Sequence, residues 1–170
     1  MIKSDYLVRA TKFMNEFAPY LKGQKKIEDV EFAVSQFNLD KKRKVIFRRG
    51  ATRYALITSD YVIKWDYDPR WVRKFGGCKE ELRIYNKAVK GGYDYLFAAI
   101  TPIKVGRRVF YVMPRVKNVG VRFHHHTRLW GYLTEEEENY VYRELGIGDL
   151  HDNNWGLRDG KPVIIDYACI

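Results

Sequence analysis

At 170 residues the chain has the length of a single domain, and a composition of 46% hydrophobic and 31% charged residues is typical of a chain that buries a core. These values exclude wholesale disorder, and two cysteines are too few for a disulfide framework or a thiolate zinc site. The net charge of +10, from 31 Lys and Arg against 21 Asp and Glu, favours an anionic partner such as nucleic acid, nucleotide phosphate or an acidic protein.

No stretch of the sequence approaches the roughly 20 consecutive apolar residues of a membrane-spanning helix. The first residues also lack the apolar run behind a basic head that marks a secretory signal peptide. Together with the low cysteine count, these features predict a protein of the reducing cytoplasm, the host cytoplasm if the chain is viral, with no membrane contact.

The first part of the chain is predicted to be helical. Apolar residues recur at three- and four-residue steps from Tyr6 to Leu21, and Gly23 interrupts the pattern. A second, shorter helix is predicted for residues 28–37. The runs that follow are short and rich in β-branched and aromatic residues, with turn residues between them, which is typical of an antiparallel meander. The predicted strands of this meander are residues 45–47, 54–57 and 61–65.

The remainder of the chain alternates between helices and strands. Thr134 and Glu137 have the spacing of a capping box, which marks the beginning of a helix, and Asp159-Gly160 is typical of a hairpin turn. An apolar stripe between two Gly-Gly pairs predicts another helix. The predicted helices are residues 78–90 and 134–146, and the predicted strands are residues 96–100, 109–116, 155–157 and 162–165. This order of elements predicts an α+β fold.

The densest chemical signal lies in the last quarter of the chain. Asp149 is followed five residues later by Asn154, and Asp166 follows an apolar run of buried-strand type. Phosphoryl transfer needs a carboxylate beside the attacking hydroxyl, oxygen ligands for Mg²⁺ and positive charge on the phosphates. A loop between Asp149 and Asn154 lets the aspartate face an acceptor while Asn154 and Asp166 face Mg²⁺, which prefers oxygen ligands.

This spacing, Asp149-x-x-x-x-Asn154 followed by Asp166-Tyr-Ala, resembles the catalytic loop and metal-binding motif of the protein-kinase-like superfamily. Conventional protein kinases have His-Arg before the aspartate and Lys two residues after it, whereas here Ile-Gly precedes and His151 follows. The form Gly-Asp-Leu-His is closer to aminoglycoside-type phosphotransferases and to small kinase-like proteins of bacteriophages. The resemblance implies that Asp149 is the catalytic residue and that Asn154 and Asp166 bind the metal.

The resemblance implies three further parts, and a match to each lies upstream in the family's order. Lys64, in a Val-Ile-Lys run on the third predicted strand, corresponds to the lysine that binds the ATP phosphates. Glu81 on the following helix is expected to hold that lysine, with Glu80 as the alternative because one register step separates them. Met113 corresponds to the gatekeeper, and the backbone that follows it to Val116 is expected to meet adenine.

The sequence departs from the family pattern in two places. The loop between the first two predicted strands contains one glycine, Gly50, where protein kinases usually have two or three. Gly50 can still turn the backbone, and the amides of residues 51–53 with the charge of Arg53 can reach phosphate oxygens. The sequence continues for only four residues after Asp166, so we expect no activation segment and no large C-terminal lobe. The early-gene protein kinases of tailed bacteriophages, which modify host proteins, are similarly short.

The predicted architecture is an α+β, kinase-like fold in three parts. A helical N-terminal extension covers residues 1–43, and a lobe with a five-stranded antiparallel sheet and one inserted helix covers residues 44–116. A reduced C-terminal lobe with the catalytic loop covers residues 117–170.

The expected function is an ATP- and Mg²⁺-dependent phosphotransferase that acts on a Ser, Thr or Tyr hydroxyl of a partner protein. Three alternatives stay open. The Gly-Asp-Leu-His form favours a small-molecule kinase, and the glycine-poor loop favours a pseudokinase that binds nucleotide or protein. The basic charge favours a polyanion contact, which in the third alternative is the binding of nucleic acid.

Overall fold

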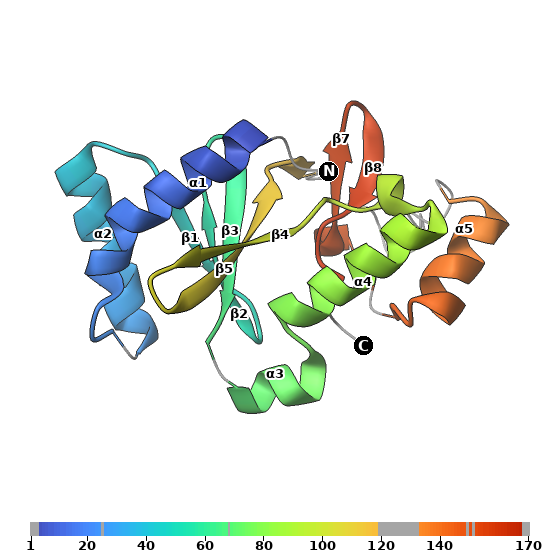
Figure 1. Ribbon diagram of the computed structural model, residues 1–170, viewed down its shortest axis with the longest axis horizontal. Coiled ribbons are helices and arrows are strands. Elements are labelled where there is room, and N and C mark those ends of the chain that lie inside the picture. Colours follow the sequence, from blue (N-terminus) through green and yellow to red (C-terminus); the bar gives the residue numbers. More distant parts are fainter. Residues whose placement is uncertain are drawn as a thin grey trace. The chain divides into compact units, whose positions relative to one another are not determined.

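The computed structural model describes residues 4–24, 26–67, 69–118, 133–148, 150 and 152–167 (Figure 1). The chain forms two compact units: unit 1 is Met1–Tyr67 with Thr101–Arg115, and unit 2 is Asp68–Ile100 with Val116–Ile170. Both helices and antiparallel strands are present, so the predicted α+β class is confirmed. Within the described ranges, no helix is long and apolar enough to cross a membrane.

Unit 1 contains the predicted five-stranded antiparallel sheet. Its strand order is β1-β2-β3-β5-β4, which makes β3 the central strand. The first three strands form the predicted meander. The strands are β1 (Ile46–Arg49), β2 (Arg53–Ile57), β3 (Tyr61–Asp66), β4 (Thr101–Val105) and β5 (Arg108–Pro114).

The predicted strand at residues 96–100 is wrong. Residues Asp94–Leu96 form a 3-10 turn, η2, and β4 begins only at Thr101. Phe97 instead forms an isolated parallel bridge with Ile164, and the Ala98 amide donates to the Ile164 carbonyl at 2.8 Å. Residues 96–100 are apolar and buried. A run this short has no periodicity that distinguishes a strand from a buried irregular segment.

The N-terminal helices supply much of the core of unit 1. They are α1 (Ser4–Phe17), the 3-10 turn η1 (Ala18–Leu21) and α2 (Ile27–Lys41), and they lie against the sheet (Figure 1). The Phe37 ring meets Phe13 and Phe17 edge to face, with centroid distances of 5.3 and 5.2 Å. Such aromatic pairs contribute about 0.5–1.5 kcal/mol each beyond the burial of their area. The helices of the predicted extension at residues 1–43 therefore share one core with the sheet.

Unit 2 combines helices with a small three-stranded sheet of order β6-β7-β8. Its sheet consists of β6 (Lys117–Asn118), β7 (Trp155–Arg158) and β8 (Lys161–Ile164). The predicted hairpin is confirmed: Asp159 and Gly160 have φ values of 53° and 78°, as a tight turn between β7 and β8 requires. The helices are α3 (Pro69–Phe75), α4 (Cys78–Gly91), α5 (Glu135–Asn139), its π-helical continuation η4 (Tyr140–Glu144) and the 3-10 turn η5 (Asp152–Asn154).

The predicted capping box at the beginning of α5 is also confirmed. The Glu137 amide donates to the Thr134 hydroxyl at 3.2 Å, and the Thr134 amide donates to the Glu137 carboxylate at 2.6 Å. The Tyr95 hydroxyl donates to the same carboxylate at 2.7 Å. Partial burial and this hydrogen bond raise the pKa of Tyr95 to about 12. The short helix α3 was not predicted, because seven residues are too few to show a helical period.

Candidate functional site

Lys64 lies in the middle of the central strand of unit 1. It pairs with Ala55 on β2 and with Tyr111 on β5. Because paired residues and residues two apart share a face of a sheet, Arg53, Lys64 and Met113 lie on one face. Lys64 and Arg53 are 9% and 8% exposed, and Met113 is 2% exposed. Three of the predicted nucleotide-binding residues therefore share a surface of the sheet.

That surface is not the one covered by the N-terminal helices. The core shared with α1 and α2 uses the alternate residues of the same strands, among them Leu56 on β2 and Ile63 on β3. Ile63 is fully buried and directly precedes Lys64, so its side chain points to the opposite face. Because side chains alternate along each strand, one face of the sheet packs against the N-terminal helices and the opposite face carries Arg53, Lys64 and Met113.

The loop between β1 and β2 does not use the conformational freedom of glycine. The φ of Gly50 is outside the left-handed region, and a Cβ added there would lie 3.6 Å from the Arg53 carbonyl oxygen, an ordinary contact. The Gly50 amide donates to that same oxygen at 2.8 Å. The turn is therefore closed by backbone hydrogen bonding, and a larger residue than glycine fits at this position.

Tyr67, which the sequence analysis missed, fixes this loop. Its hydroxyl lies 2.6 Å from the Ala51 carbonyl oxygen and 3.2 Å from that of Gly50. Its ring stacks on Tyr54 at 4.4 Å, and the Arg49 guanidinium lies over the ring at 5.3 Å from the centroid. The sequence contains no signal for this role, because Tyr67 lies beyond the end of β3 and reaches back to the loop before β2.

In unit 2, Asn154 and Asp166 lie next to each other. The amides of Ile165 and Asp166 both donate to the Asn154 carbonyl, at 2.7 and 3.4 Å. Asn154 is 3% exposed and Asp166 is half-buried. The end of β8 and the turn before β7 therefore hold the two predicted metal ligands within one hydrogen-bonded segment.

These two side chains suit Mg²⁺ by the type of their donor atoms. Mg²⁺ prefers hard oxygen ligands and usually takes only one or two carboxylates from protein, with water and substrate phosphates completing its shell. Over the described part of the chain, no group of three or more His, Cys, Asp or Glu could hold a metal ion. The residues present thus fit an ion that arrives with its nucleotide, and they do not form a closed protein cage.

Glu81 is fully buried on α4 and is joined to the segment after Asp166. Its Oε1 accepts the Tyr167 amide at 3.4 Å, and the Tyr167 hydroxyl donates to the Ala98 carbonyl at 2.9 Å. Glu80 differs: its carboxylate forms a surface ion pair with Arg83 on the same helix. Of the two glutamates left open by the sequence, Glu81 is the buried one, and it accepts a hydrogen bond from Tyr167 of the same unit.

The structure brings together some predicted residues and leaves others apart. Glu81, Asn154 and Asp166 belong to unit 2, whereas Lys64 belongs to unit 1, so the pairing of Lys64 with Glu81 stays a prediction. The half-buried Val116 is the first residue of unit 2 after β5. The expected adenine-binding hinge therefore includes the point at which the chain continues from unit 1 into unit 2. Asp149, like His151 of the same loop, lies outside the described residues.

No protein-family model matches the sequence, and no curated protein matches it either. A kinase-like assignment therefore depends on the residues and their geometry alone.

Proposed function

We propose that this chain is an ATP- and Mg²⁺-dependent phosphotransferase, a minimal viral-type protein kinase that phosphorylates a Ser, Thr or Tyr hydroxyl of a partner protein. The observation that carries the proposal is the Asn154–Asp166 pair. An amide and a carboxylate, predicted as metal ligands from the resemblance of their motif, lie on adjoining backbone linked through the Asn154 carbonyl. These backbone hydrogen bonds at the base of the hairpin keep the main chains of the two residues close to each other.

In this mechanism, Mg²⁺ neutralises charge on the transferred phosphate when it is bound. Asn154 and Asp166 would hold it through their side-chain oxygens. Tyr167, directly after Asp166, donates its backbone amide to Glu81 and its side-chain hydroxyl to the Ala98 carbonyl, so it is held through both its backbone and its side chain. This second layer of contacts limits the movement of the Asp166 carboxylate.

Unit 1 supplies the nucleotide-binding residues in this proposal. Lys64 binds the α and β phosphates, and Arg53 and the loop at Gly50 add positive charge and backbone amides. Met113 borders the adenine, and the backbone at Val116 meets it. The support for this assignment is that Arg53, Lys64 and Met113 share the sheet face that the N-terminal helices leave to other contacts.

Asp149 orients or deprotonates the acceptor hydroxyl, a role worth roughly 10² to 10⁴ in rate. The test is Asp149→Asn, assayed with labelled ATP, Mg²⁺ and a bacterial lysate and resolved on a gel. We expect labelling of protein to fall at least about 100-fold with no change in the unfolding midpoint. The matched control is Asp159→Asn, since Asp159 is exposed and has a φ of 53°, which Asn adopts readily. Unchanged labelling by Asp149→Asn refutes the assignment.

The same assay separates the acceptor classes. Label in a protein band supports a protein acceptor, and label that stays in small molecules indicates a small-molecule kinase.

A pseudokinase is the second candidate, and the loop between β1 and β2 is the observation that favours it. The φ of Gly50 is not in the left-handed region that favours glycine, and the Tyr67 hydroxyl lies within hydrogen-bond distance of the Gly50 and Ala51 carbonyl oxygens of the loop. A thermal shift at millimolar ATP and Mg²⁺ without any labelled product would support nucleotide binding alone. No shift at that concentration would indicate a module that acts through protein contact.

A further inference from the structure

The net positive charge of the chain lies in unit 1. Residues 1–67 and 101–115 hold 18 of the 31 Lys and Arg and 8 of the 21 Asp and Glu, a net charge of +10. Unit 2 holds the remaining 13 of each and is neutral. A field of one sign on one unit attracts polyanions to that unit. Phosphotransfer at the site proposed above does not require this asymmetry.

Within unit 1, the basic side chains converge on a pocket of about 500 Å³. Its walls are α1, the segment between α2 and β1, and the turn between β2 and β3. Arg9 and Lys12 come from α1, and Arg43 and Lys44 come from the segment before β1. Asp60 is the acidic residue of the lining. Among the lining residues that the structure describes, four cations stand against one carboxylate, which makes the pocket suitable for an anion.

Two of these cations have carboxylate partners and two do not. The Arg9 guanidinium lies 2.9 Å from the Asp60 carboxylate, and Arg43 lies 2.9 Å from the Glu16 carboxylate. Lys12 and Lys44 are exposed, and neither forms an ion pair with any residue that the structure describes. The two arginines are therefore held in the wall of the pocket by their carboxylate partners, and the two lysines are available to bind an anionic ligand.

The chemistry of the pocket favours phosphate over apolar or stacking contacts. The rings that line it, Phe13 and Tyr61, are 2% and 6% exposed, so they offer no platform for an unpaired base. A protein partner usually inserts apolar side chains into the centre of an interface, whereas the apolar side chains described in this lining, Phe13 and Val45, are 2% and 7% exposed and its charged side chains are the accessible ones. Contacts to a nucleic-acid backbone are dominated by charge and need no such surface.

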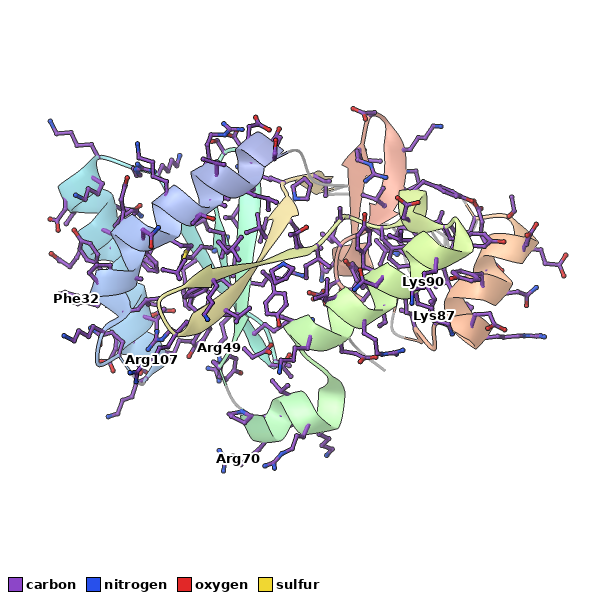
Figure 2. All side chains as sticks on the ribbon, in the orientation of Figure 1. Phe32, Arg49, Arg70, Lys87, Lys90 and Arg107 are labelled. Carbon is purple, nitrogen blue, oxygen red and sulfur yellow. The ribbon has the colours of Figure 1, made fainter. Side chains whose placement is uncertain are left out.

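Further cations extend the charge beyond the pocket. Lys41 and Lys42 directly precede Arg43 and are exposed, and the exposed Arg49 and Arg107 of unit 1 lie at the other end of the strands from the pocket (Figure 2). A ligand with one phosphate would use only the pocket, whereas a chain of phosphates can engage several cations in turn. The extent of the basic surface therefore favours a polymer.

We propose that unit 1 binds the phosphate backbone of a nucleic-acid duplex, with one phosphate held between Lys12 and Lys44. The binding is independent of base sequence, because the pocket offers cations and hydroxyl groups but no exposed ring or base-reading element. It is also independent of the phosphotransfer proposed for Asn154 and Asp166, which lie in the other unit.

The test is fluorescence anisotropy of the full chain with a labelled DNA duplex of about 20 base pairs, between about 50 and 200 mM salt. The variant Lys12→Glu/Lys44→Glu is expected to weaken binding at least about tenfold and to lower the slope of log K against log salt by about two. The matched control is Lys79→Glu/Lys90→Glu on α4, which makes the same charge change at two exposed lysines of unit 2 (Figure 2 labels Lys90). It is expected to keep the slope of the unmodified chain.

Each outcome decides the proposal. Equal weakening by both double variants, or no binding by the unmodified chain, refutes the pocket as the site. Competition by polyglutamate of equal charge overturns it in favour of an acidic protein, and competition by inorganic triphosphate overturns it in favour of a small phosphate. Duplex DNA and duplex RNA binding alike supports backbone recognition. Asp166→Asn is expected to bind the duplex normally, so failure of binding and failure of phosphotransfer can be told apart.

Discussion

The buried carboxylate of Glu81 offers a test of how unit 2 holds its predicted metal site. Glu81→Ala removes both the charge and the acceptor of the Tyr167 amide, whereas Glu81→Gln removes the charge and keeps an oxygen in the same place. Because the charge is lost in both variants, the difference between them measures the lost acceptor and the lost volume. This design separates the local hydrogen bond from every electrostatic role of Glu81.

The magnitude follows from the geometry. A buried amide without an acceptor costs about 1–3 kcal/mol, and the distance of 3.4 Å places this bond in the lower half of that range. Glu81 is 0% exposed, so truncation also leaves a cavity that costs about 1 kcal/mol or more. We therefore expect Glu81→Ala to be about 2–3 kcal/mol less stable than Glu81→Gln.

The assay is urea unfolding followed by tryptophan fluorescence, because Trp155 of β7 is buried in the same unit. Amide hydrogen exchange gives an independent readout, since the Tyr167 amide should exchange faster in Glu81→Ala than in Glu81→Gln. A difference in unfolding free energy below about 0.5 kcal/mol, with equal exchange of that amide, would show that the hydrogen bond contributes nothing and refute the reasoning.

Two further predictions concern α4 and α5. Gly91→Ala should destabilise the protein by about 1–3 kcal/mol in thermal or urea unfolding, because its Cβ would overlap the Tyr140 hydroxyl and lie 2.9 Å from Cζ. Tyr140→Phe should recover part of that loss, and equal losses with and without the hydroxyl would contradict this. Burial opposes ionisation of Glu137, but hydrogen bonds from Thr134 and Tyr95 outweigh it and lower the pKa below 4.5. This stabilisation is therefore present above pH 4.5 and is lost as the pH falls through the folded-state pKa of Glu137. Over that range, the free energy of unfolding should fall more steeply with decreasing pH in the unmodified protein than in Glu137→Gln. Parallel curves for the two proteins would contradict this.

Local features of the fold could be predicted from the sequence. The hairpin turn needs two residues that accept positive φ, and Asp159-Gly160 supplies them within the turn itself. The beginning of α5 needs a hydroxyl and a carboxylate three residues apart, as Thr134 and Glu137 are. In both cases the interacting groups lie within four residues, so the sequence contains the whole interaction.

The candidate site was predictable only in part. The alternation of side chains along β2, β3 and β5 places Arg53, Lys64 and Met113 on one face once the strand pairing is known, but the pairing of β3 with β5 is not a local property. The sequence contains no signal that the Tyr67 hydroxyl bonds to the β1–β2 loop. It also contains no signal that Glu81 is fully buried. A choice between Glu80 and Glu81 needed the phase of α4, which sequence periodicity leaves uncertain by one residue.

The sequence by itself determined the longer helices, the meander, the terminal hairpin and the spacing from Asp149 to Asn154 to Asp166, because each depends on neighbouring residues. Tertiary structure decided which distant segments meet. The Tyr167 amide finds its acceptor 86 residues away on Glu81, and Phe97 pairs with Ile164 where a strand was predicted. It also decided that the charge of +10 belongs to one unit, because unit 1 is assembled from two separate stretches of chain. A buried polar group must find a partner somewhere, and only the folded chain shows which one it finds.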